Sequence, residues 1–309
     1  EIVSLIDPFP DEESQKIAKN HNLEIYNDFD EALSLSKLDA IILCTPNSFH
    51  MEQTIKASKL GIHVFCEKPL SLRSIEVKKM IDACNENGSL LGVGHERRFE
   101  KGWMRLKDIV TSNKLGSIMY AEGHFSHDKL AGLPSDNWRA DPKFAPAAGM
   151  TGMGVHLTDL MIWLFGPVER VFATTAKRVL DFKTGDVVTA SLQHHSGLST
   201  QITAILKTTH YQRVTIWGEN GWVELVDSSH PDTPGPSSMK IVMNDGTIEE
   251  ENFEWTDTVS ANIHNFIDSI SGEREYLFTD VEKFQNISVL EAIYQSSLSK
   301  QNEKVESFN

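Results

Sequence analysis

The sequence has no long hydrophobic run. Its longest apolar runs contain about six residues, whereas an α-helix needs about 20 apolar residues to cross a bilayer. The first residues also lack the positively charged stretch followed by an apolar stretch that marks a secretory signal. The sequence therefore predicts neither a membrane protein nor an exported one.

Cysteine is scarce, and the motifs of several enzyme classes are missing. The three cysteines, Cys44, Cys66 and Cys84, are an odd number, and two of them end apolar runs where a free thiol packs as a small hydrophobe. A reducing cytoplasm is the expected compartment. There is no Cys-x-x-Cys pair, no Gly-x-Ser-x-Gly elbow and no P-loop lysine, so zinc and P-loop chemistry are not expected. No metal site is predicted.

Basic residues are fewer than acidic ones. The chain has 29 Lys and Arg residues against 44 Asp and Glu residues, a formal net charge of -15. No segment gathers Lys and Arg into a stripe that could neutralise a phosphate backbone. Nucleic acid is therefore not an expected partner.

Short apolar runs alternate with helix-like stretches through the first third of the chain. The runs are Ile2 to Ile6, Ala40 to Cys44, Ile62 to Cys66 and Leu90 to Val93. Continuous apolarity is typical of parallel strands that helices cover on both faces. The pattern predicts a doubly wound α/β domain over residues 1–115. Asn47 is expected as the N-cap of one crossover helix, which should end near Gly61.

Residues 116–309 have a different pattern and predict a second, α+β domain with a large, mostly antiparallel open sheet. The expected strands are Val187 to His194, Gln201 to Leu206, Arg213 to Trp217, Trp222 to Val226, Met239 to Met243 and Thr247 to Phe253. Hairpin turns are expected at Ser196-Gly197, Asn220-Gly221 and Asp245-Gly246. Helices are expected over Met150 to Phe165, Ser260 to Ser271 and Val281 to Ser299.

A dinucleotide-binding fold of the Rossmann type normally opens with a strand, a Gly-x-Gly-x-x-Gly turn and a helix, and this glycine pattern is absent. The run from Ile2 to Asp7 instead resembles the second strand of that fold, with a terminal acid for the adenosine ribose. The alternative is that Asp7 is only a turn residue before Pro8. The chain is thus expected to start about 30 residues late. If it is complete, weak or no NAD binding is expected.

A carboxylate at Asp7 would accept hydrogen bonds from both ribose hydroxyls and would repel a 2'-phosphate. No Arg or Lys follows within eight residues to offset that repulsion. The sequence therefore favours NAD over NADP.

Two segments follow predicted strands where the ligand crevice of an open α/β sheet lies. They are Cys44-Thr45-Pro46-Asn47-Ser48-Phe49-His50 and Cys66-Glu67-Lys68-Pro69-Leu70. With Gly94-His95-Glu96-Arg97-Arg98-Phe99, Trp138-Arg139, the stretch from Gly152 to Leu160 and that from Glu291 to Ser296, the chain resembles the Gfo/Idh/MocA family over essentially its whole length. The resemblance implies cofactor contacts from Asp7, Cys44, Thr45, Pro46, Asn47, His50, Glu67, Lys68 and His95.

The resemblance implies that Lys68 is the general acid/base of the reaction. In the family, the lysine of this Glu-Lys-Pro segment reaches the oxygen on the reacting carbon, and the following peptide is often cis. A lysine suits this task because partial desolvation lowers its pKa from about 10.4. The alternative is a surface lysine beside a turn proline. Glu67 could contact the nicotinamide ribose, orient Lys68 or simply end the strand.

The resemblance also makes His156 a second catalytic residue, in substrate binding or a proton relay. Many relatives carry Asp four residues before this His, where this sequence has Gly152, so a Lys-Asp-His relay is in doubt. Asp159 lies three residues after His156 on the same helical face and could orient the imidazole or bind substrate. A helix acid bonded to its own backbone is the alternative for Asp159.

Other expected substrate contacts lie in two loops. Many relatives have Asn where this chain has His95, which would face the nicotinamide or the substrate. Arg98 is predicted among the substrate contacts, although an ion pair that anchors its loop is the favoured interpretation. Trp138 and Arg139 are expected to close over the substrate. Three more residues are candidates for the same pocket: His124, His127 and Asp128.

The expected activity is NAD(P)-dependent interconversion of a secondary alcohol and a ketone on a sugar, sugar derivative or cyclitol. Two alternatives remain open: a redox-neutral glycosidase that uses bound NAD, and a non-catalytic NAD- or sugar-sensing protein with the same fold. The presence of Lys68 and His156 favours an enzyme, and Gly152 argues mildly against one. The resemblance also implies a homodimer or homotetramer.

Overall fold

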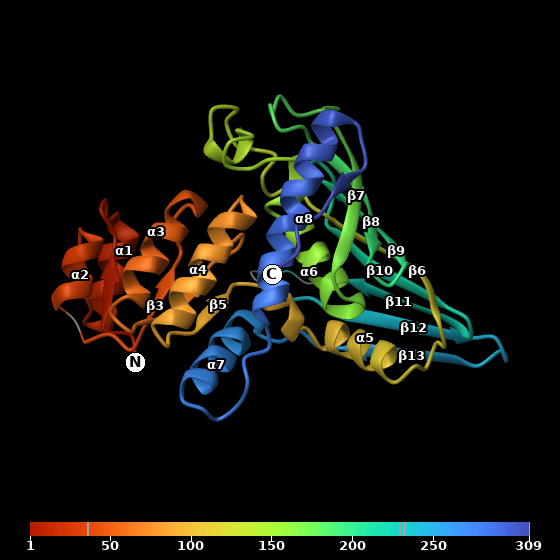
Figure 1. Ribbon diagram of the computed structural model, residues 1–309, viewed down its shortest axis with the longest axis horizontal. Coiled ribbons are helices and arrows are strands. Elements are labelled where there is room, and N and C mark those ends of the chain that lie inside the picture. Colours follow the sequence, from red (N-terminus) through yellow and green to blue (C-terminus); the bar gives the residue numbers. More distant parts are fainter. Residues whose placement is uncertain (36, 229, 231–232, 309) are drawn as a thin grey trace.

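The structure is a computed structural model in which residues 1–35, 37–228, 230 and 233–308 are described. The chain folds into a part with short parallel strands and a part with one large, mostly antiparallel sheet (Figure 1). This architecture confirms the predicted fold class.

Five short parallel strands and their helices make up the first part. The strands are β1 (Ser4–Ile6), β2 (Glu24–Tyr26), β3 (Ala40–Leu43), β4 (His63–Cys66) and β5 (Leu91–Val93). The helices are α1 (Glu12–His21), α2 (Phe29–Leu35), α3 (Asn47–Ser58) and α4 (Ser74–Glu86). All four predicted apolar runs form strands. The sequence did not indicate β2, because Glu24–Tyr26 is too short and too polar for an apolar pattern.

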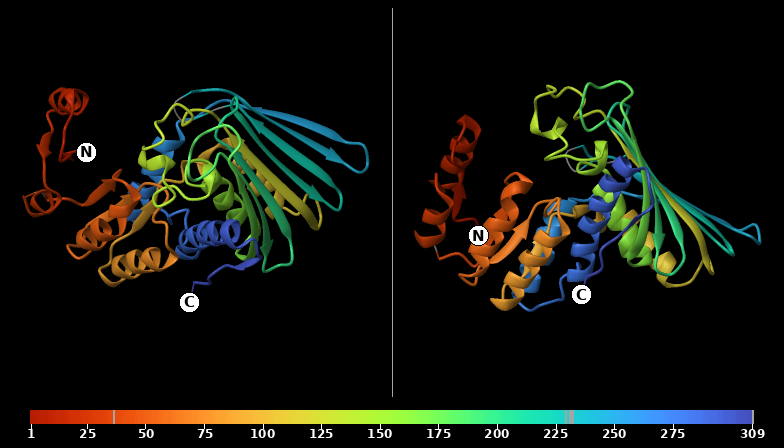
Figure 2. Two further views of the ribbon diagram at one scale, coloured as in Figure 1. Left: turned by 90° about the horizontal axis from the view of Figure 1, so that it is seen from above. Right: turned by 45° about the horizontal axis from the view of Figure 1, so that its top comes forward.

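The parallel strands form two sheets rather than one. β1 pairs with β2, and β3, β4 and β5 pair in that order. No strand of the described chain joins β1 to β3 through hydrogen bonds, and Figure 2 shows the β1–β2 unit standing apart from the other three strands. The carboxyl ends of β3, β4 and β5 nevertheless lie at one edge, as a parallel sheet requires.

Helix α3 differs from the prediction at its first residue. Pro46 occupies the N-cap position and Asn47 is the first helical residue, so Asn47 is not the N-cap. The Asn47 side-chain amide instead donates to the carbonyl oxygen of Phe144, at 3.0 Å. This long-range bond competes with local capping and was not visible in the sequence. The helix ends at Ser58, and Gly61 follows with a φ of 75°, close to the predicted stop.

The second part is built on a nine-stranded sheet with the order β13-β12-β11-β10-β6-β9-β8-β7-β14. Its strands are β6 (Ile118–Ser126), β7 (Val168–Ala176), β8 (Val187–His194), β9 (Ser199–Ile205), β10 (Tyr211–Gly218), β11 (Gly221–Asp227), β12 (Ser237–Met243), β13 (Ile248–Phe253) and β14 (Glu303–Lys304). The three predicted hairpins join β8 to β9, β10 to β11 and β12 to β13. Strands β6, β7 and β14 are additions to the prediction.

Helices cover one face of this sheet. They are α5 (Lys101–Thr111), α6 (Gly154–Phe165) and α8 (Asp280–Ser299), and a fourth helix, α7 (Thr258–Ile270), packs beside the first part. Residues along β11 alternate between buried and half-buried, as expected when one face meets a core. In Figure 2 the helices lie on one side of the sheet, and no helix of the described chain lies over the other side.

The two parts share an extensive contact. Helix α7 packs on β4 and on the 3₁₀ helix η1 (Glu96–Phe99), and α8 packs on α4 (Figure 1). The division at residues 115 and 116 stays a prediction, because α7 and α8 return from the second part to the first. Lys283 of α8 reaches across this contact and donates to the carbonyl oxygen of Leu91, at 2.9 Å.

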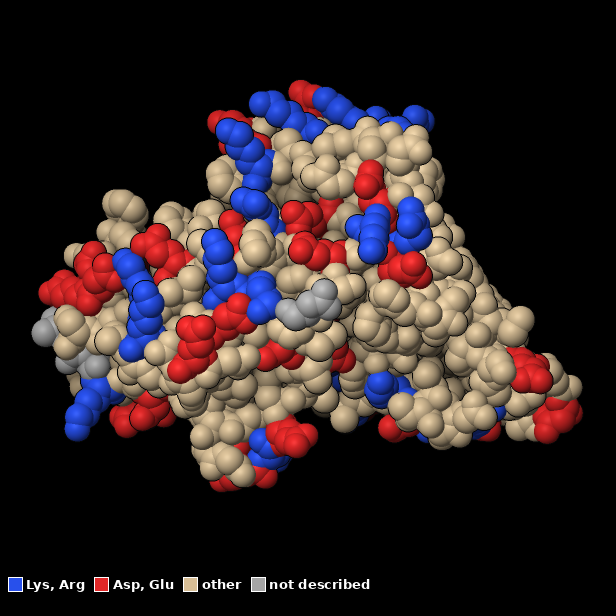
Figure 3. Space-filling model, viewed as in Figure 1, with Lys and Arg blue, Asp and Glu red and all other residues tan. Residues whose placement is uncertain are grey.

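Two further features are the distribution of charged side chains on the surface and the hydropathy of the helices. On the face drawn in Figure 3, Lys and Arg side chains lie among Asp and Glu side chains. Among the described helices, none is long and apolar enough to span a membrane.

Gly218 ends β10 at an irregularity of its pairing with β6. A Cβ atom at this position would collide with the carbonyl oxygen and the Cβ of Leu115, which is buried. We expect Gly218→Ala to lower the free energy of unfolding by about 1–3 kcal/mol, measured by denaturant unfolding, because backbone cannot yield easily. Gly132→Ala is the control, since a Cβ at Gly132 meets nothing within 4 Å. Equal stability of the two variants would contradict the account.

Candidate active site

Lys68 lies where the two parts of the molecule meet. It directly follows Glu67 at the carboxyl end of β4, and the peptide between Lys68 and Pro69 is cis. The Lys68 ammonium donates to the carbonyl oxygen of Gly152, at 3.1 Å, just before helix α6. A side chain from the parallel sheet is thus held against the loop that leads into the His156 helix.

The surroundings of Lys68 weaken its hold on a proton. Desolvation at this junction lowers the pKa of Lys68 from its ordinary value, and the positive charges of Arg97 and Arg139 act in the same direction. Glu96 and Glu67 oppose the shift but do not cancel it. A lysine with a lowered pKa can give up and regain a proton nearer to neutral pH than a solvated lysine.

Glu67 is fixed beside Lys68 by close backbone packing. Its carboxylate accepts a hydrogen bond from the Lys68 backbone N–H, at 3.1 Å. A Cβ on Gly94, which follows β5, would lie only 2.7 Å from Oε1 of Glu67. Gly94 therefore leaves the space that this carboxylate occupies. Burial raises the pKa of Glu67, against the lowering effect of Lys68.

His95 and His156 come together from different elements. His95 precedes η1 and His156 lies in the first turn of α6, yet their ring centroids are 5.6 Å apart in an edge-to-face arrangement. Both residues are buried, and Nδ1 of each ring has no hydrogen-bond partner among the described residues. Burial lowers the pKa of His95 to about 4 and the pKa of His156 well below its ordinary value. Both rings are therefore neutral at physiological pH.

Arg98 and Asp159 bind each other. The guanidinium donates from Nε and Nη2 to the two oxygens of the Asp159 carboxylate, both at 2.8 Å, and from Nη1 to Glu282 at 3.1 Å. The ion pair expected for Arg98 is thus present. Because Arg98 and Asp159 are buried and already paired, their contacts favour a structural task over direct substrate contact.

The loop after β3 is tied to the Lys68 loop by His50. The His50 ring lies within hydrogen-bond distance of Thr45 O through Nε2, at 2.8 Å, and of Pro69 O and Leu70 O through Nδ1, at 3.1 and 3.2 Å. Both nitrogens are therefore occupied by protein carbonyls. This arrangement supports a positioning role rather than the predicted cofactor contact through the imidazole.

Other residues of this loop divide between the surface and the interior. Cys44 and Pro46 are exposed at the carboxyl edge of the sheet, where a ligand can reach them. The Thr45 hydroxyl donates to Gln53, at 2.6 Å. Partial desolvation of its sulfur and the nearby Glu67 raise the pKa of the Cys44 thiol, so this cysteine is a weak nucleophile. All three cysteines are free thiols.

Asp7 ends β1 with its carboxylate oriented by local groups. Oδ1 accepts from the Phe9 backbone N–H at 2.9 Å, and Oδ2 accepts from the Ser14 hydroxyl at 3.4 Å. Each oxygen retains a free lone pair for a further donor. This geometry is compatible with both interpretations of Asp7: an acid that binds the adenosine ribose, and a turn residue before Pro8.

The predicted closing loop carries an exposed stack. The Arg139 guanidinium lies over the Trp138 ring, 4.1 Å from its centroid, within the short 3₁₀ helix η2 (Trp138–Ala140). Arg139 is exposed and Trp138 half-buried. Since Arg139 contributes to the lowered pKa of Lys68, its charge acts at the same site.

Two of the further histidine candidates lie in different surroundings. His127 is buried beside Phe125, whose ring also approaches His156. His124 instead packs edge-to-face on Tyr211 and contacts the Ser126 hydroxyl. Neighbouring strand residues alternate between faces, so His124 and Phe125 point to opposite sides of the sheet. That His124, His127 and Asp128 line one pocket stays a prediction; Asp128 is exposed.

Arg97 and Glu96 also act on Lys68, although the sequence did not single them out. Arg97 is buried with its guanidinium 4.4 Å from the Phe125 ring centroid and pairs with Glu100, at 2.5 Å. Both Arg97 and Glu96 affect the pKa of Lys68. In the sequence these residues form a cluster of charges between a buried strand and an amphipathic helix. Such a cluster is equally typical of a solvated turn.

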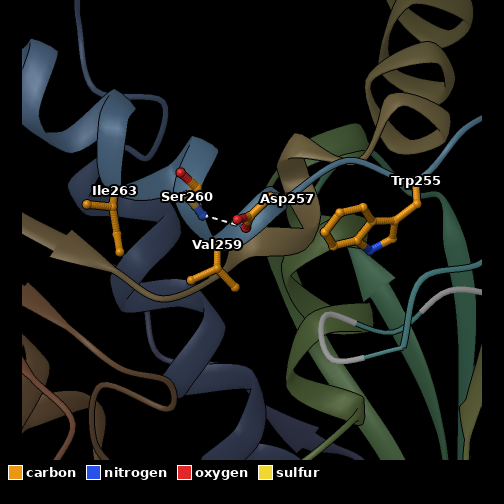
Figure 4. A pocket seen from close by; sticks show the side chains of 5 residues that line it. All are labelled: Trp255, Asp257, Val259, Ser260 and Ile263. Atoms are coloured by element: carbon orange, nitrogen blue, oxygen red, sulfur yellow. Dashed lines mark hydrogen bonds between the residues drawn. The ribbon is translucent and has the colours of Figure 1, made fainter. Parts of the chain in front are cut away.

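One surface hollow lies away from Lys68 and His156. It has a volume of about 390 Å³ and is lined by Trp255, Asp257, Val259, Ser260 and Ile263, on α7 and the segment before it (Figure 4). None of the predicted site residues lines it. The described residues also contain no group of three or more His, Cys, Asp or Glu side chains placed to hold a metal ion.

The buried His95 makes stability depend on pH. An unfolded imidazole takes up a proton near pH 6.5, whereas folded His95 does so only near pH 4. The unfolded state therefore binds more protons between these values, and we expect stability to fall as pH drops from 6.5 to 4. His95→Gln should flatten this slope in denaturant unfolding series. His264→Gln, at an exposed position, should leave it; identical slopes for both variants would contradict the assignment.

The chain resembles curated sugar-acting proteins in sequence. It is 26% identical to the D-xylose 1-dehydrogenase (NADP(+)) 2 of Haloferax volcanii over 276 residues, which are 88% of this chain and 82% of that protein. It is 34% identical to the 2,7-anhydro-N-acetylneuraminate hydratase of Mediterraneibacter gnavus over 119 residues, 38% of this chain and 31% of that protein. Three further relatives are matched over only 41 to 47% of their own length.

A solved structure and two family models agree on the fold. The WlbA dehydrogenase of Bordetella pertussis, solved with NADH and UDP-GlcNAcA, superposes with a TM-score of 0.83 at 23% identity, covering 100% of this chain and 91% of that one. Residues 1–95 match the oxidoreductase family with an NAD-binding Rossmann fold, and residues 103–224 match the GFO/IDH/MocA C-terminal domain. The matches follow the two parts of the fold in order, and the chain belongs to the Gfo/Idh/MocA family.

Proposed function

We propose that the protein is an NAD-dependent oxidoreductase that interconverts a secondary alcohol and a ketone on a sugar, sugar derivative or cyclitol. The observation that carries the proposal is the position of Lys68, which follows β4 at the carboxyl edge of the sheet and is held by Gly152 beside the His156 helix. A titratable amine with a lowered pKa at this junction suits proton transfer to or from a substrate oxygen.

The residues present suit a bound nicotinamide dinucleotide. Asp7 and Glu67 offer carboxylate oxygens to ribose hydroxyls, and the exposed Cys44 and Pro46 lie at the same sheet edge as Lys68. The unpartnered Nδ1 atoms of two buried imidazoles also mark a place where polar ligand groups would be accepted. When bound, NAD supplies the hydride acceptor or donor. The Asp7 carboxylate favours NAD over NADP.

In the oxidising direction, the neutral Lys68 amine accepts the proton of the reacting hydroxyl while hydride leaves the same carbon. The O–H and C–H bonds break, the C=O bond forms, and Lys68 becomes an ammonium that returns its proton in the reverse reaction. The ammonium also stabilises negative charge on the oxygen. Positioned proton transfer of this kind contributes about a hundredfold to ten-thousandfold in rate.

His156 acts as a neutral hydrogen-bonding group for the substrate. Burial and the positive charges of Lys68 and Arg97 keep its pKa well below the ordinary value, so the ring stays neutral, with one nitrogen as a donor and the other as an acceptor. The carbonyl oxygen of Gly152 cannot take a proton from Lys68 as a carboxylate would. Proton exchange from Lys68 therefore does not run through residue 152 in this chain.

A redox-neutral reaction is the second candidate. The hydratase named above supports it, since that relative shares 34% identity with part of this chain. The two candidates differ in whether NADH accumulates, because a redox-neutral enzyme restores its bound NAD in each turnover. A reducing compartment and a dimer or tetramer stay expectations alongside both candidates.

Replacing Lys68 tests the proposal. A panel of sugars and polyols, assayed by NADH absorbance, first identifies a sugar that the wild type turns over. We expect Lys68→Ala in the full-length protein to reduce turnover of that sugar by about a hundredfold to ten-thousandfold. NADH binding, measured by fluorescence, should change little. Lys59→Ala, on an exposed residue after α3, is the control. Turnover by Lys68→Ala at the wild-type rate would refute the role.

Replacing Asp7 tests the cofactor preference. In the full-length protein, Asp7→Ser should weaken NADH binding and improve NADPH binding, because it removes both a ribose acceptor and a charge that repels the 2'-phosphate. We expect the ratio of the two dissociation constants to move by roughly tenfold, about 1.4 kcal/mol. Glu24→Gln, an exposed residue on the neighbouring strand β2, should leave the ratio unchanged. An unchanged ratio in Asp7→Ser would assign Asp7 to the turn.

A further inference from the structure

Two contacts connect η1 to helix α6 at equal spacing. His95 and Arg98 are three residues apart around η1, and His156 and Asp159 are three residues apart on α6. His95 meets His156 with 5.6 Å between ring centroids, and Arg98 meets Asp159 through two hydrogen bonds of 2.8 Å. Positions three residues apart face the same way on both kinds of helix. The ion pair therefore runs beside the histidine pair.

The ion pair is the more rigid of the two contacts. Arg98 is completely buried, and its planar guanidinium is also held by Glu282 and by the faces of Phe278 and Trp163, with ring centroids 4.3 and 5.3 Å from Cζ. A bidentate pair fixes both distance and angle. Two carboxylates and two aromatic rings therefore restrain the guanidinium.

The histidine pair is less firmly held, with the Asn286 side chain close enough to His95 to raise its pKa through a hydrogen bond. The rings touch edge to face, and their Nδ1 atoms lack hydrogen-bond partners among the described residues. One packing link connects the two contacts, because the Phe278 ring lies 6.3 Å from the His95 ring and also stacks on Arg98. From α8, Asn286 donates to Val155 O and Thr158 Oγ1, both at 3.0 Å, and so fixes the turn of α6 that carries His156.

We infer that Arg98 and Asp159 are positioning residues that set the distance between His95, on the cofactor side, and His156, on the substrate side. The inference rests on the proposed function, because it assigns His156 to the substrate. The pair does not touch the reacting atoms. It acts by holding the two imidazoles at a spacing that keeps cofactor and substrate at the distance needed for hydride transfer. A displacement of about 1 Å between reacting groups can lower the rate about a hundredfold.

Two conservative variants of the full-length protein test this assignment. Asp159→Asn keeps the shape but turns one acceptor into a donor, and Glu282 still balances the charge of Arg98. Arg98→Lys keeps the charge but loses the planar fork. We expect each variant to fold, to bind NADH within twofold of wild type, and to lose tenfold or more in kcat with a smaller change in the KM of the sugar.

The control variant breaks a bidentate ion pair of the same kind that does not involve η1 or α6. Arg105 forms another bidentate pair, with Glu251 of β13, at 2.8 to 3.0 Å. Glu251→Gln breaks a fork of the same kind and should leave kcat and KM unchanged. Wild-type kcat in both Asp159→Asn and Arg98→Lys, with intact folding, would overturn the inference. A loss of kcat in Arg98→Lys, together with a changed separation of the His95 and His156 rings, supports it even if Asp159→Asn fails to fold.

A structural readout separates this inference from the proposed function. Crystal structures of wild type and of each variant give the separation of the His95 and His156 rings, 5.6 Å in the intact site. A changed separation in a folded variant supports positioning, and an unchanged one in both variants overturns it. If wild type turns over no sugar, the proposed function fails while this measurement still decides the positioning role.

Discussion

The hydrogen bond from Lys68 to the Gly152 carbonyl joins the two parts of this molecule at the point where its chemistry is proposed to occur. An ammonium that loses water at such a junction needs other partners, and burial makes its charge costly. Glu96 and Glu67 supply part of the compensation, while Arg97 and Arg139 reduce it. The balance leaves a lysine with a lowered pKa, and this requires that both parts stay in fixed contact.

One buried set of charges crosses that contact. Arg98 of η1 pairs with Asp159 of α6 and Glu282 of α8, with the rings of Phe278 and Trp163 against its guanidinium. Arg97 pairs with Glu100 beside it, and its Nε and Nη2 have no hydrogen-bond partner among the described residues. A buried ion pair contributes little net stability, but removing one partner leaves an uncompensated charge. Such pairs therefore specify geometry more than they stabilise the fold. His95 and His156 avoid this difficulty by remaining neutral.

The sequence was sufficient for the fold class, the four apolar strands, the hairpins and the placement of Lys68 at a strand end, because each depends on local periodicity or turn chemistry. It missed β2, which is short and polar, and it misplaced Asn47, whose amide bonds to Phe144 far along the chain. The pairing of Arg98 with Asp159 and the meeting of His95 with His156 depend on how η1 packs against α6. No spacing along the chain encodes that contact, so the sequence left the task of Asp159 open and did not single out Arg97.

The most direct test of the central claim is a crystal structure of the full-length protein with NADH and a sugar that it turns over. The account predicts the Lys68 ammonium within about 2.6–3.2 Å of the reacting oxygen, with His156 on the same side of the sugar. A sugar and nicotinamide bound away from Lys68 and His156 would contradict it.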